Sequence, residues 1–82
     1  MTGLAILISG SGRTMVNIAR RCEKGIIPAR VSIVISSHQC EGIKRAREIG
    51  IPSIIVSGNM ISEHLDSLSC NYNFSYIALA GY

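Results

Sequence analysis

The residues best suited to chemistry form a short glycine-containing segment near the start of the chain. Residues 9–14 read Ser-Gly-Ser-Gly-Arg-Thr and follow directly on an aliphatic run. Glycines let a backbone turn sharply and approach a ligand closely, and the free N–H groups and dipole of a following helix favour an anion there. Arg13 adds a positive charge, and Ser11 and Thr14 add hydroxyl groups. We predict a phosphate-binding site made of Gly10, Ser11, Gly12, Arg13 and Thr14.

The segment does not fit a dinucleotide. The G-x-G-x-x-G fingerprint requires a third glycine where this chain has Met15, and the acidic residue expected about 20 residues further on is missing, because Ser36 and Ser37 stand there. A P-loop is excluded because no Gly-Lys-Ser/Thr follows. The pattern therefore favours a phosphate monoester over NAD, and a tight turn that binds no ligand is the alternative.

Composition limits the class of protein. The chain has 82 residues, of which 48% are hydrophobic and 16% charged, so we expect one small ordered domain over residues 1–82. Its net charge of +3 and few aromatic residues favour a small phosphorylated ligand over a nucleic acid. The apolar run at residues 4–8 is too short to span a membrane. The 3 cysteines form no disulfide pattern, which favours the cytoplasm.

Four short aliphatic runs alternate with helical patterns. Runs of this length without polar alternation are typical of strands buried on both faces of a parallel sheet. They are Leu4–Ser9, Val31–Ser36, Ser53–Ser57 and Tyr76–Ala80.

Three amphipathic helices are expected between these strands. The first has Met15, Ile18, Ala19 and Cys22 on its apolar face, Thr14 as N-cap and Gly25 after its end. The second has Ile43, Ala46 and Ile49 on its apolar face and ends at Gly50. The third is weaker, with Ile61, Leu65 and Leu68, and Asn59 as its cap.

The resulting order, βαβαβαβ, predicts an α/β fold: the N-terminal half of a doubly wound, Rossmann-like parallel sheet with strand order 3-2-1-4. The first two helices should cover one face and the third helix the other. Because one short helix cannot cover four strands, we expect a large uncovered apolar patch, which is met by self-association with a second chain, by aggregation or by further residues of a parent protein. We also expect the chain to be the front part of a larger domain that is cut off after the fourth strand.

Two clusters of polar residues are further candidates for a site. His38 and Cys40 are two potential metal ligands without a second pair at zinc spacing, which favours a solvated loop and no metal site. Glu63, His64 and Asp66 fall on the weak third helix and are expected to be an exposed face.

Several segments of the chain, in order, resemble one family of enzymes, the phosphoribosylglycinamide formyltransferases (folate-dependent glycinamide ribonucleotide transformylases). The matching segments are spread in order along the whole chain: Ile6–Gly12, Val34–Ser37, Gly42–Pro52 and Ala78–Tyr82. The closing Ala-Leu-Ala-Gly-Tyr looks like the family's strand-four segment.

The resemblance implies a doubly wound fold and transfer of a formyl group from 10-formyltetrahydrofolate to the amine of glycinamide ribonucleotide in purine synthesis. It assigns the substrate phosphate to Gly12, Arg13 and Thr14, although the family usually has Ser-Asn where this chain has Arg13-Thr14.

The family's catalytic Asn-x-His segment, catalytic Asp and most of its folate pocket follow the fourth strand. The resemblance therefore implies that this chain alone binds substrate without turnover. A non-catalytic phosphate-binding or interaction module on the same half-fold is the alternative. A related folate-dependent formyl hydrolase or aminoacyl-tRNA formyltransferase is a third possibility, which the glycine loop fits less well.

Overall fold

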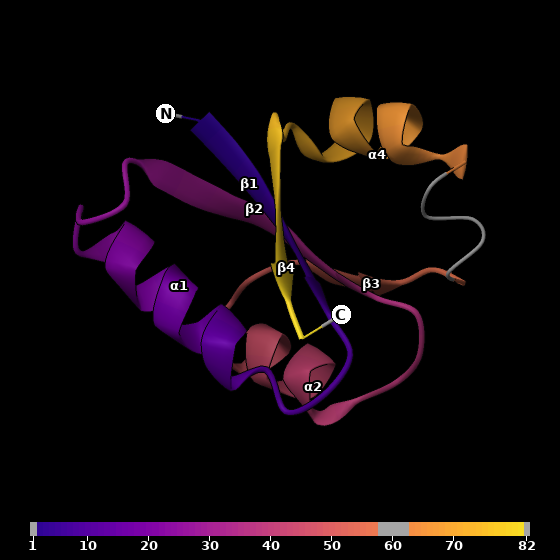
Figure 1. Cartoon of the computed structure of the whole chain (residues 1–82), viewed down its shortest axis with the longest axis horizontal. Coiled ribbons are helices and arrows are strands. Elements are labelled where there is room, and N and C mark those ends of the chain that lie inside the picture. The colour runs from indigo at the N-terminus through magenta and orange to yellow at the C-terminus, as the bar shows by residue number, and fades with distance from the viewer. Residues whose placement is uncertain (1, 58–62, 82) are drawn as a thin grey trace.

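The computed structural model describes residues 2–57 and 63–81. These residues form four parallel strands and three helices, in the alternating order that the sequence predicts (Figure 1). The strands are β1 (Thr2–Ile8), β2 (Ala29–Ser36), β3 (Ser53–Ile55) and β4 (Tyr76–Ala80). The helices are α1 (Arg13–Glu23), α2 (Glu41–Glu48) and α4 (Leu65–Tyr72). Asn59 and Ile61, expected in the third helix, lie outside the described residues.

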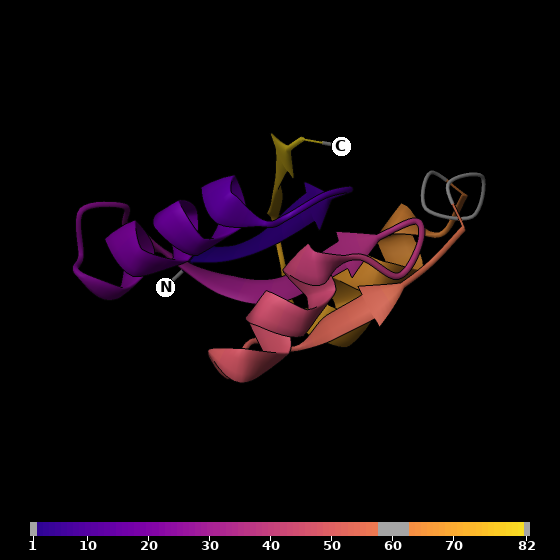
Figure 2. The ribbon, with the colours of Figure 1, turned by 90° about the horizontal axis from the view of Figure 1, so that it is seen from below.

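The strand order is β3-β2-β1-β4, and every neighbouring pair is parallel. This confirms the predicted order 3-2-1-4 and the half of a doubly wound sheet. Figure 2 shows β4 at one edge of the twisted sheet, away from β3. The chain runs from β1 to β2 and β3 in one direction and then returns to the other side of β1, so the switch in direction falls between β1 and β4.

Two apolar clusters fill the two faces of the sheet. On the first face, Ile6 and Ile8 of β1 pack with Met15 of α1 and with Ile43 of α2. On the second face, Leu7 lies in a cluster with Ala5, Ile33, Ile35 and Phe74, against which Leu65, Leu68 and Tyr72 of α4 pack. The first two helices therefore cover one face and α4 the other, as predicted.

The predicted glycines, Gly25 and Gly50, each lie two residues past the end of an early helix. The N–H groups of Gly25 and Ile26 donate to the carbonyls of Cys22 (3.1 Å) and Arg21 (2.9 Å). The N–H groups of Gly50 and Ile51 repeat this pattern on Arg47 (3.2 Å) and Ala46 (2.9 Å). These are Schellman pairs, which satisfy the last carbonyls of each helix.

The prediction for Ile49 was wrong. This residue was expected on the buried face of the second helix, but α2 ends at Glu48 and the Ile49 side chain is 49% exposed. The helical period stops applying once the chain leaves the helix, so Ile49 no longer follows Ile43 and Ala46 into the core.

The edge strand β4 is covered unevenly. Ala78 and Ala80 pack on the face that carries α1 and α2. Ile77 and Leu79 point to the α4 face and are 41% and 70% exposed. Apolar side chains therefore lie uncovered on the face where the sequence predicts a patch.

Candidate functional site

The four strands end level with one another. Ile8, the last residue of β1, is paired with Ser36 of β2 and Ala80 of β4, and Ser36 is paired with Ile55 of β3. The loops that follow all leave the sheet at this carboxyl edge. The loop of residues 9–12 does so beside the switch in strand direction, which is where ligands bind in open α/β sheets.

Gly12 is the N-cap of α1, and its backbone is left-handed, with φ +81°. Thr14, the predicted N-cap, was the wrong choice, because α1 already begins at Arg13 and Thr14 lies inside its first turn. A left-handed residue next to right-handed helical ones turns successive N–H groups toward one side, and such concavities bind anions. The short sequence Gly-Arg-Thr does not reveal which of these residues lies outside the helix.

The N–H groups at the start of α1 have no backbone acceptor among residues 2–57 and 63–81. Val16 is the first residue whose N–H donates within the helix, to the carbonyl of Gly12 at 2.9 Å. Among the described residues, no backbone hydrogen bond outside the helices and strands has an N–H of residues 11–14 as its donor. No side chain caps the helix, and its first turn holds no acidic residue. The site therefore offers several free donors and a positive dipole end.

The predicted site residues are consecutive and lie where the loop of residues 9–12 enters the first turn of α1. Gly10, Ser11, Arg13 and Thr14 are exposed there, and Gly12 is buried beneath them. Arg13 is the first residue of α1, so its positive charge belongs to the end of the helix that carries these N–H groups. The main-chain donors can hold a compact, doubly charged oxyanion, and Arg13 adds a positive charge at the same end of the helix.

Two neighbouring segments, the end of β4 and the start of α2, hold the glycine loop in place. Sequence reasoning missed both contacts. The Ser9 hydroxyl donates to the carbonyl of Gly81, directly after β4. The N–H of Gly42, in the first turn of α2, donates to the carbonyl of Gly10 at 2.9 Å. A contact between loops distant in sequence leaves no periodic signal, although strand order alone does place these three loops at one edge.

The loop after β2 is organised around a buried hydroxyl. The Ser36 hydroxyl donates to the carbonyl of His38 at 2.7 Å and accepts a bond from the Cys40 thiol at 3.5 Å. The His38 side chain is exposed, with Nδ1 3.2 Å from the Ser37 hydroxyl. Within the described ranges, no three His, Cys, Asp or Glu side chains gather where they could hold a metal ion.

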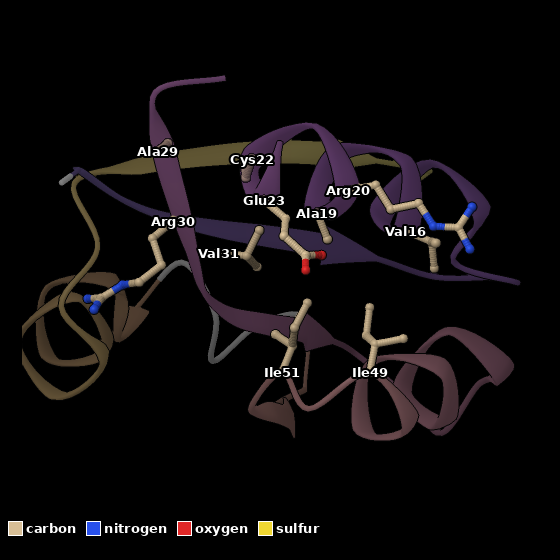
Figure 3. Close-up of a pocket in the computed structure, with 10 residues that line it drawn as sticks. All are labelled: Val16, Ala19, Arg20, Cys22, Glu23, Ala29, Arg30, Val31, Ile49 and Ile51. Atoms are coloured by element: carbon tan, nitrogen blue, oxygen red, sulfur yellow. The ribbon is translucent and has the colours of Figure 1, made fainter. Parts of the chain in front are cut away.

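A hollow in the described part of the chain lies elsewhere, between α1 and α2 (Figure 3). This groove has a volume of about 420 Å³ and lies over the start of β2, at the opposite end of the strands from the glycine loop. Ile49 and Ile51 face Glu23 across it. Burial raises the pKa of the neighbouring Cys22 thiol. The groove is a gap between two helices and is separate from the candidate anion site.

Fold and strand order define the chain as part of a Rossmann-like, doubly wound α/β domain. No protein-family model matches the chain. A curated protein, the phosphoribosylglycinamide formyltransferase of Haemophilus influenzae, is 34% identical over 93 residues, which cover 100% of this chain and 42% of that protein. The chain thus spans less than half the length of this relative.

Solved structures give the same result. Glycinamide ribonucleotide transformylase 1 from Symbiobacterium toebii superposes with a TM-score of 0.88 at 31% identity, over 100% of this chain and 42% of that one. The transformylase 1 from Geobacillus kaustophilus gives a TM-score of 0.87 at 27% identity, over 100% and 47%. The chain is therefore related over its whole length to phosphoribosylglycinamide formyltransferases, and the resemblance predicted from its residues is confirmed.

None of the helices in the described part of the chain is both long and apolar enough to cross a membrane.

Proposed function

We propose that this chain supplies the substrate-phosphate site of a phosphoribosylglycinamide formyltransferase. In this proposal Gly10, Ser11, Gly12, Arg13 and Thr14 bind the phosphate of glycinamide ribonucleotide. The observation that supports it is the row of unused N–H groups at the start of α1, at the switch in strand direction. The relationship to formyltransferases narrows the phosphate ester to the substrate of that family.

The role of the loop is to anchor one end of the substrate. A phosphate held by several fixed donors leaves the rest of the molecule with one end tethered, so its amine reaches a limited volume near the carboxyl edge of the sheet. The free N–H groups lose less conformational entropy on binding a dianion than an exposed, flexible side chain would, because backbone donors are already oriented.

Formyl transfer needs further groups. The amine of glycinamide ribonucleotide attacks the formyl carbon of 10-formyltetrahydrofolate, a base takes the amine proton, and a donor stabilises the oxyanion before tetrahydrofolate leaves. We assign neither the base nor the oxyanion donor to a residue of this chain. We therefore expect the 82-residue chain to bind glycinamide ribonucleotide without catalysing transfer. We place the protein in the cytoplasm, in keeping with its free cysteines.

A second candidate is a phosphate-binding or interaction module without catalysis. The exposed Ile77 and Leu79 of β4 favour an interaction role. The two candidates differ in one assay: a module binds phosphate esters with no preference for the glycinamide group, whereas a formyltransferase site prefers glycinamide ribonucleotide to ribose 5-phosphate.

Calorimetry with glycinamide ribonucleotide tests the proposal. Wild-type chain should bind it, and Arg13→Glu should lower the affinity by about tenfold or more, because a guanidinium next to the phosphate is replaced by a like charge. Arg21→Glu is the matched control, since it makes the same charge change in the last turn of the same helix. It should have only a small, salt-sensitive effect. Absence of binding at millimolar ligand, or equal losses in both variants, would contradict the proposal.

A further inference from the structure

The start of α2 lies directly against the glycine loop. Besides the hydrogen bond from the Gly42 N–H to the Gly10 carbonyl, the backbones of Gly42 and Gly12 are in close contact. A Cβ on Gly12 would lie 2.6 Å from the Cα of Gly42. Gly42 is buried, and it is the second residue of α2. Two helix starts therefore meet through a pair of glycines.

A side chain at Gly42 would press on the loop itself. Its Cβ would lie 3.0 Å from the Gly10 carbonyl oxygen and 3.1 Å from the Gly12 Cα, and it would also collide with Cδ1 of Ile8. The Ile8 atom is the end of a side chain, but the other two belong to the backbone of the loop. Relief of these contacts requires the loop to shift by some tenths of an ångström.

The needs of α2 do not explain a glycine here. Alanine forms helices better than glycine, and the backbone of Gly42 is not left-handed. Gly42 therefore makes α2 less stable than alanine would. The close approach of the glycine loop is what requires glycine at this position.

We propose that Gly42 is a positioning residue for phosphate binding: it sets the place of the Gly10–Gly12 backbone from beneath and thereby the direction of the free N–H groups at the start of α1. This inference rests on the proposed phosphate site. Because hydrogen bonds weaken steeply with poor alignment, a small shift of the loop should reduce affinity for phosphate while the fold is retained.

The test is calorimetric titration with inorganic phosphate, paired with thermal unfolding, for four proteins. They are the wild-type chain, Gly42→Ala, Ile8→Val, and the double variant Gly42→Ala/Ile8→Val. Ile8→Val removes the Cδ1 atom with which the new methyl group collides but leaves both backbone contacts in place. Ile8→Val thereby separates an effect of Gly42→Ala on the stability of the fold from an effect on the position of the loop.

Gly42→Ala should bind phosphate about tenfold more weakly than wild type, as expected when a hydrogen bond to a charged group is misaligned. The double variant should unfold at a higher temperature than Gly42→Ala and still bind weakly, whereas Ile8→Val alone should bind like wild type. Wild-type affinity in the double variant would overturn the inference, because it would mean that Gly42 acts only through packing on Ile8. Absence of phosphate binding by the wild-type chain would instead overturn the proposed site itself.

Discussion

Gly12 combines two constraints in one residue. Its φ of +81° is a conformation that residues with a Cβ rarely adopt, and the space where a Cβ would lie is occupied by Gly42. Replacement by alanine would have to overcome both the backbone penalty and the collision. Both the turn before α1 and the packing of α1 against α2 therefore require glycine at this N-cap position.

Cys22 gives a prediction at the residue scale. Burial raises the pKa of its thiol, whereas Cys70 is exposed. Because the thiolate is the nucleophile, iodoacetamide at pH 8 should modify Cys70 quickly and Cys22 slowly in the folded chain, and both should react alike in urea. Mass spectrometry of timed samples measures this. Equal rates in the folded chain would contradict the burial of Cys22.

The same shift has a consequence for stability. The folded pKa of Cys22 lies above that of the unfolded thiol, so both states hold the proton at low pH and the group then has no effect. As the pH rises through the pKa of the unfolded thiol, ionisation favours the unfolded chain. The free energy of unfolding should therefore fall in alkaline solution, and less so in Cys22→Ala.

At the scale of elements, α2 is held to the sheet by very few side chains. Ile43 and Ala46 are fully buried, and the helix is only 8 residues long. A helix this short is not stable alone in water, so its packing maintains it. Because α2 contains Gly42, which contacts the glycine loop, a displacement of this helix would also displace the loop.

Ile43→Ala should therefore cost about 2–5 kcal/mol of unfolding free energy, the range for removal of a large buried aliphatic side chain. Ile49→Ala is the matched control, since this side chain is half exposed just past the same helix, and it should cost less than about 1 kcal/mol. Urea denaturation followed by circular dichroism measures both. Similar losses in the two variants would mean that α2 is not anchored as described.

Elements were predictable where a pattern repeats. Met15 and Cys22 on one helix, and Ile43 with Ala46 on the next, have the period of a buried helical face, and all four are buried. Thr14 and Ile49 were placed wrongly because both stand at helix ends, where the period gives no boundary. The contact between Gly42 and Gly12 could not be predicted, since it depends on how two helices cross the sheet edge.

At the scale of the whole molecule, the strand order could be predicted in full. The exposure of apolar side chains on the sheet could be predicted in part. The alternation of strands and helices sufficed for the order 3-2-1-4 and for the faces of the helices. It also led to the expectation of uncovered apolar residues, and Ile77 and Leu79 are exposed on the edge strand β4. The pattern of strands and helices does not define what packs on these two side chains, because such a contact leaves no periodic signal.

Self-association is the prediction at this scale. Apolar side chains and the free edge of β4 should make the sedimentation coefficient of the chain rise with concentration. Leu79→Lys should suppress the rise, because it places a charge on the exposed α4 face of β4. Tyr76→Lys, which adds the same charge where the sheet carries α1 and α2, should suppress it less. A monomer that stays unchanged across micromolar concentrations would contradict this prediction.

The central claim is that the N–H groups at the start of α1 bind phosphate. An NMR titration of the ¹⁵N-labelled chain with inorganic phosphate tests it most directly, because each amide reports separately. We predict saturable shifts of the amide signals of Gly12, Arg13 and Thr14, together with that of Ser11, and little change at the groove between α1 and α2. Unchanged loop signals at saturating phosphate, or shifts confined to other basic residues, would contradict the account.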